Sequence, residues 1–93
     1  MASMTFDEFD TALNGVWYHW RDDMPMMAME ELAELSQAIS KYKRKPTAER
    51  AENLKRELAD VYIATEALLR MWDLKFGAEE CKQYMEEKLS KKY

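Results

Sequence analysis

The chain has 93 residues, a net charge of −4 and one cysteine, and 47% of its residues are hydrophobic. This length predicts a single domain over residues 1–93, small enough to need oligomerisation for a well-buried core. The negative charge argues against a nucleic acid polymer as partner, and the lack of an apolar run of about 20 residues argues against a membrane span. The lone Cys81 suits a reducing compartment, and the acidic start MASMTFDEFD lacks the pattern of a signal peptide, so a cytoplasmic location is expected.

Helix signals fill the first half of the chain. A first helix is predicted at about residues 6–20, with Thr5 as its N-cap. The break RDDMP follows, and its proline is typical of a first helical turn. A second helix is therefore predicted over about residues 25–42. The positive side chains of KYKRK indicate its C-terminal end, because the helix dipole stabilises cations there.

The second half continues the same pattern. Thr47 is expected to cap a third helix that extends as far as Phe76, with Gly77 as the residue that terminates it. Residues 78–92 form a shorter fourth helix. The sequence therefore predicts an all-α fold, and the simplest architecture is a four-helix antiparallel bundle.

The second helix carries carboxylates on an apolar flank. With about 100° of rotation per residue and Ala28 as zero, Glu31 falls at about −60° and Glu34 at about −120°, whereas Glu30 points to the polar side. The predicted core stripe lies within about 40° of zero and consists of Leu32, Leu35, Ile39 and Tyr42.

The third helix repeats this arrangement. With Leu58 as zero, Glu57 lies near −100° and Asp60 near −160°, in the mainly apolar half and apart from the other charged residues of the helix. The predicted core stripe of this helix consists of Ala51, Leu54, Leu58, Tyr62, Thr65, Leu69, Trp72 and Phe76.

If the two helices pack antiparallel, the pairs Glu31–Glu34 and Glu57–Asp60 converge, because each pair has i, i+3 spacing. Carboxylates about 5 Å apart repel by roughly 3 kcal/mol per pair at an effective dielectric near 20. Protonation, a splayed geometry or a bound cation must relieve this repulsion. Carboxylate oxygens alone suit Mg²⁺, Mn²⁺ or Ca²⁺, and His19 does not stand in the Glu-x-x-His pattern that di-iron bundles use.

The constellation Glu30-Glu31-x-x-Glu34, a spacer, and Glu57-x-x-Asp60 resembles the EExxE…ExxD signature of the MazG-like all-α nucleoside triphosphate pyrophosphohydrolases. That superfamily includes dimeric dUTPases, dCTP pyrophosphatases and phosphoribosyl-ATP pyrophosphatase. The segments MEELAELSQAI and RELADVYIATEAL are similar to its two metal helices, and KFGAEECKQYMEEKLSKKY to its closing helix. The resemblance covers about residues 17–92.

The resemblance implies an enzyme that uses Mg²⁺, or Mn²⁺, to cleave a (d)NTP to the monophosphate and pyrophosphate, in house-cleaning of the dNTP pool. It assigns Glu31, Glu34, Glu57 and Asp60 as metal ligands and gives catalytic roles to Glu31 and to Glu30, which orients water or supports the ligands. It also implies a homodimer or homotetramer with sites near the interface.

Substrate contacts are assigned on the same resemblance. Trp20 and Tyr42 are candidates for stacking on the base, although such residues also serve as core or interface residues. Lys88 matches the first position of the family's Lys-x-x-x-Asn-x-x-Arg phosphate motif, and Lys75, Lys91 or Lys92 is expected to substitute for its arginine. Lys92 stands where the family has Asn. This departure keeps a second hypothesis open, a non-catalytic helical module for oligomerisation or for nucleotide or metal sensing.

Overall fold

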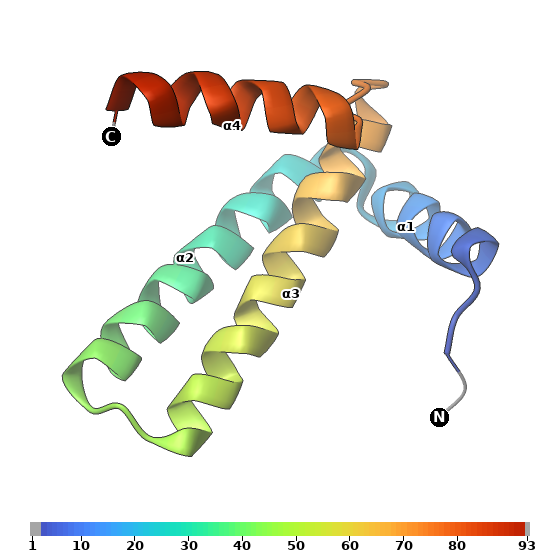
Figure 1. Cartoon of the computed structure of the whole chain (residues 1–93). Helices are drawn as coiled ribbons and strands as arrows, with labels where there is room; N and C mark the ends of the chain where they lie inside the picture. Colours follow the sequence, from blue (N-terminus) through green and yellow to red (C-terminus); the bar gives the residue numbers. More distant parts are fainter. Residues whose placement is uncertain (1–2, 93) are drawn as a thin grey trace.

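The computed structural model describes residues 3–92, and the described residues form helices and no strand. Figure 1 shows the chain. Its elements are α1 (Phe6–Trp20), the short 3₁₀ helix η1 (Arg21–Asp23), α2 (Met24–Arg44), α3 (Ala48–Met71) and α4 (Ala78–Lys92). The predicted all-α class is therefore confirmed. No described helix is long and apolar enough to cross a membrane.

Threonine caps start two of the helices where the sequence predicted them. The side-chain oxygen of Thr5 accepts a hydrogen bond from the backbone N–H of Glu8, and that of Thr47 accepts one from the N–H of Arg50. Each cap satisfies one of the amide groups that a helix leaves free in its first turn, which typically stabilises the helix by about 1 kcal/mol. At both boundaries the start of the helix is set by a threonine that caps the N–H group three residues later.

The end of α3 differs from the prediction. The helix stops at Met71 instead of Phe76, and Asp73 takes a left-handed backbone conformation with φ of 53°. The backbone N–H of Leu74 donates to the carbonyl of Leu69 at 2.7 Å, which closes the last turn. Aspartate is among the few non-glycine residues that adopt this conformation readily, so Asp73 terminates the helix in place of Gly77. Gly77 instead precedes α4.

Helices α2 and α3 form a long antiparallel hairpin, joined at its closed end by residues 45–47 (Figure 1). Helix α1 packs mainly against α3. Helix α4 runs off from the open end of the hairpin, and its described residues make hardly any contact with the other helices. The helices of one chain therefore do not all pack together into the predicted four-helix bundle.

The buried core of one chain is small and rich in alanine. Its centre consists of Met24 and Ala28 on α2 and of Ala64 and Ala67 on α3, all less than 5% exposed. Partly buried side chains surround it, namely Val16, Trp17, Met27, Leu68 and Met71. Because alanine has a short side chain, the two helices approach closely along this line.

Most of the bulky residues of the predicted core stripes are not buried in a single chain, although Ala28 at the centre of the α2 stripe is. Leu32 and Ile39 on α2 are 49% and 51% exposed, and Leu58 and Tyr62 on α3 are 41% and 74% exposed. Tyr42, Trp72 and Phe76, also assigned to the stripes, are exposed as well. The physical reason is that α2 and α3 contact each other through their alanine sides, and no other helix of the chain covers the bulkier side chains.

Candidate metal centre

Three carboxylates from the two long helices converge in the hairpin. Glu31 projects from α2, and Glu57 and Asp60 project from α3. One carboxylate oxygen from each residue lies within 4.8 Å of the corresponding oxygens of the other two. The sequence predicted this convergence from the i, i+3 spacing and an antiparallel pairing, and the prediction is confirmed for these three residues.

Alanines close to the carboxylates explain why the side chains meet. Ala28 lies one turn before Glu31 on α2, and Ala64 lies one turn after Asp60 on α3, and both alanines are buried between the helices. The close approach that they permit brings the flanking glutamates and the aspartate of the two helices within reach of one another. The carboxylates therefore converge because α2 and α3 contact each other through alanines.

Two oxygens of this group are buried without a hydrogen-bond partner. They are the Oε2 atoms of Glu31 and Glu57, the only such side-chain atoms found among the residues that the structure describes. A buried oxygen of this kind loses its hydration and gains nothing in return, which is costly for a carboxylate. A cation placed between the two helices would satisfy both atoms.

The environment raises the pKa of both glutamates above the usual value of 4.5. For Glu31 the largest cause is loss of hydration, followed by repulsion from Glu34, Asp60 and Glu57. For Glu57 the pKa rises for the same leading reason, followed by repulsion from Glu34 and Asp60. Both carboxyls are thus held by surroundings that disfavour their charged form.

Glu34 and Glu30 lie differently with respect to this group. Glu34 is exposed, and its oxygens do not belong to the converging set, but its charge raises the pKa of both Glu31 and Glu57. Glu30 is exposed and does not enter the group. The structure therefore assembles three of the four predicted ligands, with the fourth beside them.

Lys41 is a functional candidate, although the sequence indicated for it only a role at the C-terminal end of its helix. Its positive charge lowers the pKa of Glu57 and partly offsets the acidic surroundings. Lys41 follows Glu34 by seven residues on α2, so both lie on the same side of the helix, two turns apart. This seven-residue spacing is visible in the sequence, and it could have identified Lys41 as a cation on the same side of α2 as the carboxylate of Glu34.

The remaining predicted site residues lie away from the carboxylates along the chain. Tyr42 is eleven residues beyond Glu31 on α2, which corresponds to roughly 16 Å of helix rise. Trp20 ends α1, where its ring meets the His19 ring edge-on with the centroids 5.0 Å apart. Lys75 lies in the connection between α3 and α4. Lys88 stands on α4, which hardly contacts the hairpin of its own chain.

The donor set fits a hard divalent cation. All three converging groups offer carboxylate oxygens, which are the ligands that Mg²⁺, Mn²⁺ and Ca²⁺ prefer, and no histidine or cysteine takes part. Such an ion would also give a partner to the two buried oxygens that have none.

Comparison of the chain with protein-family models, with curated proteins and with solved structures finds no match.

Proposed function

We propose that the protein is a Mg²⁺-dependent pyrophosphohydrolase that cleaves a (d)NTP to the monophosphate and pyrophosphate and helps to clean the dNTP pool. The observation that carries the proposal is the convergence of Glu31, Glu57 and Asp60, with two buried oxygens left without partners. The motif resemblance to the MazG-like enzymes supplies the reaction class, and the convergence of three of the four carboxylates that it assigns to the metal supports the proposal.

In this proposal Glu31, Glu57 and Asp60 hold the metal, and Glu34, whose charge already acts on the group, is the fourth ligand. The ion, when bound, offsets the triphosphate charge and lowers the pKa of a bound water. Glu31 would position the attacking water, and Glu30, which is exposed on α2 outside the converging group, would orient water or support the ligands.

The substrate contacts of the proposal combine several elements. Lys41 supplies positive charge to the phosphates, because its charge already reaches Glu57. Trp20 and Tyr42 are the proposed stacking partners of the base, and Lys75 and Lys88 the further phosphate contacts. Because α4 hardly contacts its own hairpin, Lys88 is proposed to act on the site of another chain in a homodimer or homotetramer.

Pyrophosphate release from a panel of canonical and modified dNTPs tests the proposal. The assay is run with Mg²⁺, with Mn²⁺ and with EDTA, on the unmodified chain and on Glu57→Gln. Metal-dependent release that the variant loses is the expected result, and the rank order of the panel identifies the substrate. An absence of release from every nucleotide with either metal would refute the enzyme proposal.

A second candidate function is a non-catalytic helical module that binds metal or nucleotide. The placement of Lys88 on α4, away from the hairpin, favours it, since a single chain lacks the closing-helix phosphate contacts. Thermal shifts distinguish the two proposals. A shift that needs both metal and nucleotide, without turnover, would identify the module, whereas turnover lost in Glu57→Gln would exclude it.

A further inference from the structure

A polar hollow lies at the closed end of the α2–α3 hairpin. It is lined by Lys41 of α2 and by Glu49, Arg50 and Asn53 of α3, and we call it the closed-end hollow. Its volume is about 340 Å³. Pockets for small ligands measure about 300–1,000 Å³. The closed-end hollow is therefore large enough for a small ligand, and its lining decides which class of ligand fits.

The lining of the closed-end hollow suits an anion with several oxygens. The guanidinium of the half-buried Arg50 donates to the backbone carbonyl of Lys41 at 2.7 Å, which fixes it at the end of α2 and leaves its other N–H donors for a ligand. Neither Lys41 nor Arg50 takes part in an ion pair within the part of the chain that the structure describes. The Asn53 amide adds N–H donors, and Glu49 is the one acid of the lining. Two cations and an amide against one carboxylate are donors that fit phosphate oxygens.

The closed-end hollow lies on the same side of the hairpin as the carboxylates. On α3, Asn53 is one turn before Glu57 and rotates about 40° from it, and Arg50 is two turns before it and rotates about 20°. On α2, Lys41 follows Glu34 by seven residues and rotates about 20° from it. The charge of Lys41 also lowers the pKa of Glu57, so the two groups lie close enough to interact. The hollow thus begins about 6 Å of helix rise from Glu57, which is within the reach of a triphosphate bound at the carboxylates.

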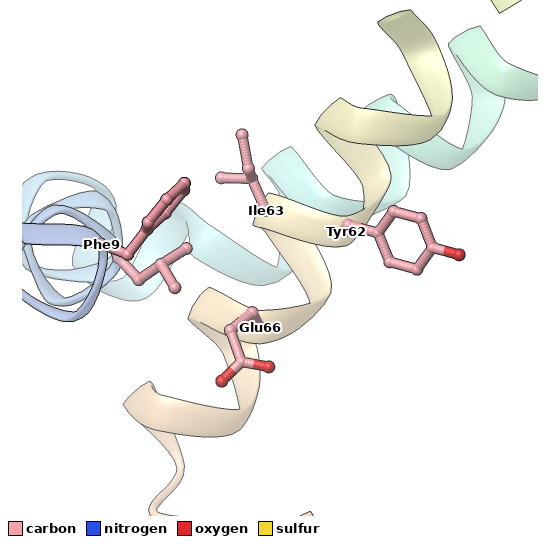
Figure 2. A pocket seen from close by; sticks show the side chains of 5 residues that line it. Phe9, Tyr62, Ile63 and Glu66 are labelled. Atoms are coloured by element: carbon pink, nitrogen blue, oxygen red, sulfur yellow. The ribbon is translucent and has the colours of Figure 1, made fainter. Parts of the chain in front are cut away.

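Helix α1 leaves this side of the hairpin uncovered. A shallow second hollow, between α1 and α3, is lined by Phe9, Leu13, Tyr62, Ile63 and Glu66 (Figure 2). Ile63, which lies toward Phe9 in this view, rotates about 120° from Glu57 on α3, so α1 packs against a different side of the helix. The charged residue of the second hollow is the acid Glu66, which would repel a phosphate. Of these two hollows, the closed-end hollow alone offers cations to a phosphate on the carboxylate side.

Toward the open end of the hairpin, the same sides of the two helices carry apolar residues. Met27 is one turn before Glu31 on α2 and rotates about 40° from it, and Leu68 on α3 rotates about 20° from Glu57. Both are partly buried and pack against the alanine core, as does Trp17 of α1. The hairpin therefore offers cations on the closed-end side of the carboxylates and apolar side chains on the open-end side.

We infer that the closed-end hollow binds the two outer phosphates of the nucleotide, which leave as pyrophosphate, and that the nucleotide runs along the hairpin with its base toward the open end. This inference rests on the proposed function, which supplies the triphosphate and the metal. It takes phosphate contacts from Arg50 and Asn53, to which the family resemblance gives no role. It also selects between the two aromatic candidates for the base, because Trp20 lies at the open end of the hairpin and Tyr42 near its closed end.

Isothermal titration calorimetry of the full chain with inorganic pyrophosphate in Mg²⁺ gives the first test, and it needs no turnover. Asn53→Leu is expected to weaken binding at least about tenfold, because the amide bonds to a charged ligand. Glu49→Gln is expected to tighten it roughly threefold, and a misfolded variant could not produce this gain. Lys55→Ala is the matched control, since Lys55 is an exposed cation of α3 outside the hollow. No binding by the unmodified chain, or equal weakening by Asn53→Leu and Lys55→Ala, would overturn the inference.

Steady-state kinetics separates this inference from the proposed function. Asn53→Leu is expected to raise KM for the nucleotide and the inhibition constant of pyrophosphate together, whereas Trp20→Ala raises KM alone, and by more than Tyr42→Ala does. Turnover with pyrophosphate inhibition unchanged in Asn53→Leu would overturn the inference and leave the enzyme standing. Pyrophosphate binding that Asn53→Leu weakens, in a chain without turnover, would support the phosphate site and refute the enzyme. A larger rise in KM from Tyr42→Ala than from Trp20→Ala would overturn the orientation of the nucleotide.

Discussion

Glu31 on α2 and Glu57 on α3 face each other across the hairpin, and each buries one carboxylate oxygen that lacks a hydrogen-bond partner. Loss of hydration, followed by repulsion from Glu34 and Asp60, raises the pKa of both carboxyls. Without a cation this pair weakens the packing of the two helices that form most of the fold. Proteins bury carboxylates that repel each other chiefly at functional sites. The stability of the chain should therefore depend on metal, on the charge of Glu57 and on pH.

Millimolar Mg²⁺ or Mn²⁺ is expected to raise the melting temperature, because the ion binds a carboxylate group that exists only in the folded chain. At 100 times the dissociation constant the gain in the free energy of unfolding is about 2.7 kcal/mol. Differential scanning calorimetry with metal and then with excess EDTA measures the effect. An unchanged melting temperature in Mg²⁺, Mn²⁺ and Ca²⁺ alike would contradict a metal site in the hairpin.

Glu57→Gln is expected to raise the melting temperature in EDTA at pH 8 and to remove its dependence on Mg²⁺. The amide takes one negative charge out of the group and offers donors to the neighbouring carboxylates. Catalytic activity should fall by at least about 100-fold, the upper range found for residues that only support metal ligands. Glu52→Gln is the matched control, since Glu52 is exposed on α3 outside the group and its loss should leave the metal dependence unchanged.

Stability in EDTA is expected to fall as the pH rises above 4.5. Because the pKa of Glu31 and of Glu57 is raised in the folded chain, the folded state binds these protons more tightly than the unfolded state. The stabilising contribution is complete below pH 4.5 and is lost as the pH rises through the raised pKa values. The melting-temperature difference between Glu57→Gln and the unmodified chain should therefore grow from pH 4 to pH 8. A constant difference would contradict the raised pKa of Glu57.

Local sequence signals predicted the helix starts and the carboxylate group. The caps at Thr5 and Thr47 depend on residues three positions apart, and the convergence of Glu31 with Glu57 and Asp60 depends only on helical spacing and an antiparallel pairing. These features follow from the geometry of a single helix or of one helix pair. They could be read without knowing where the other helices pack.

The buried sides of the helices could not be predicted in the same way. Both the alanine side and the leucine side of α3 are apolar, and periodicity favours the bulkier one, with Leu58 at its centre. The structure buries Ala64 and Ala67 instead, because α2 approaches closest there. Which of two apolar sides a partner helix covers depends on contacts between distant segments, and the position of α4 depends on them too.

Arg70→Ala is expected to loosen α1. The Arg70 guanidinium donates to Asp10 Oδ1 at 2.6 Å and to Asn14 Oδ1 at 3.3 Å, and α1 has no buried residue of its own. The ion pair is partly exposed, so the loss in the free energy of unfolding should be about 1 kcal/mol at most. Limited proteolysis should cleave α1 faster in this variant. Arg56→Ala breaks a pair within α3 instead and serves as the control. Equal cleavage of both variants would contradict an anchoring role for Arg70.

Lys41→Ala is expected to weaken nucleotide binding while metal binding persists. Lys41 is the cation whose charge acts on Glu57, and its removal should raise the pKa of Glu57 further and shift the pH dependence of metal binding upward. The loss of one charge near the phosphates should reduce kcat/KM about tenfold, mainly through KM. Lys43→Ala, a change at the same end of α2, is the control. A larger effect of Lys88→Ala than of Lys41→Ala would instead place the phosphate contact on α4, reaching the hairpin from another chain.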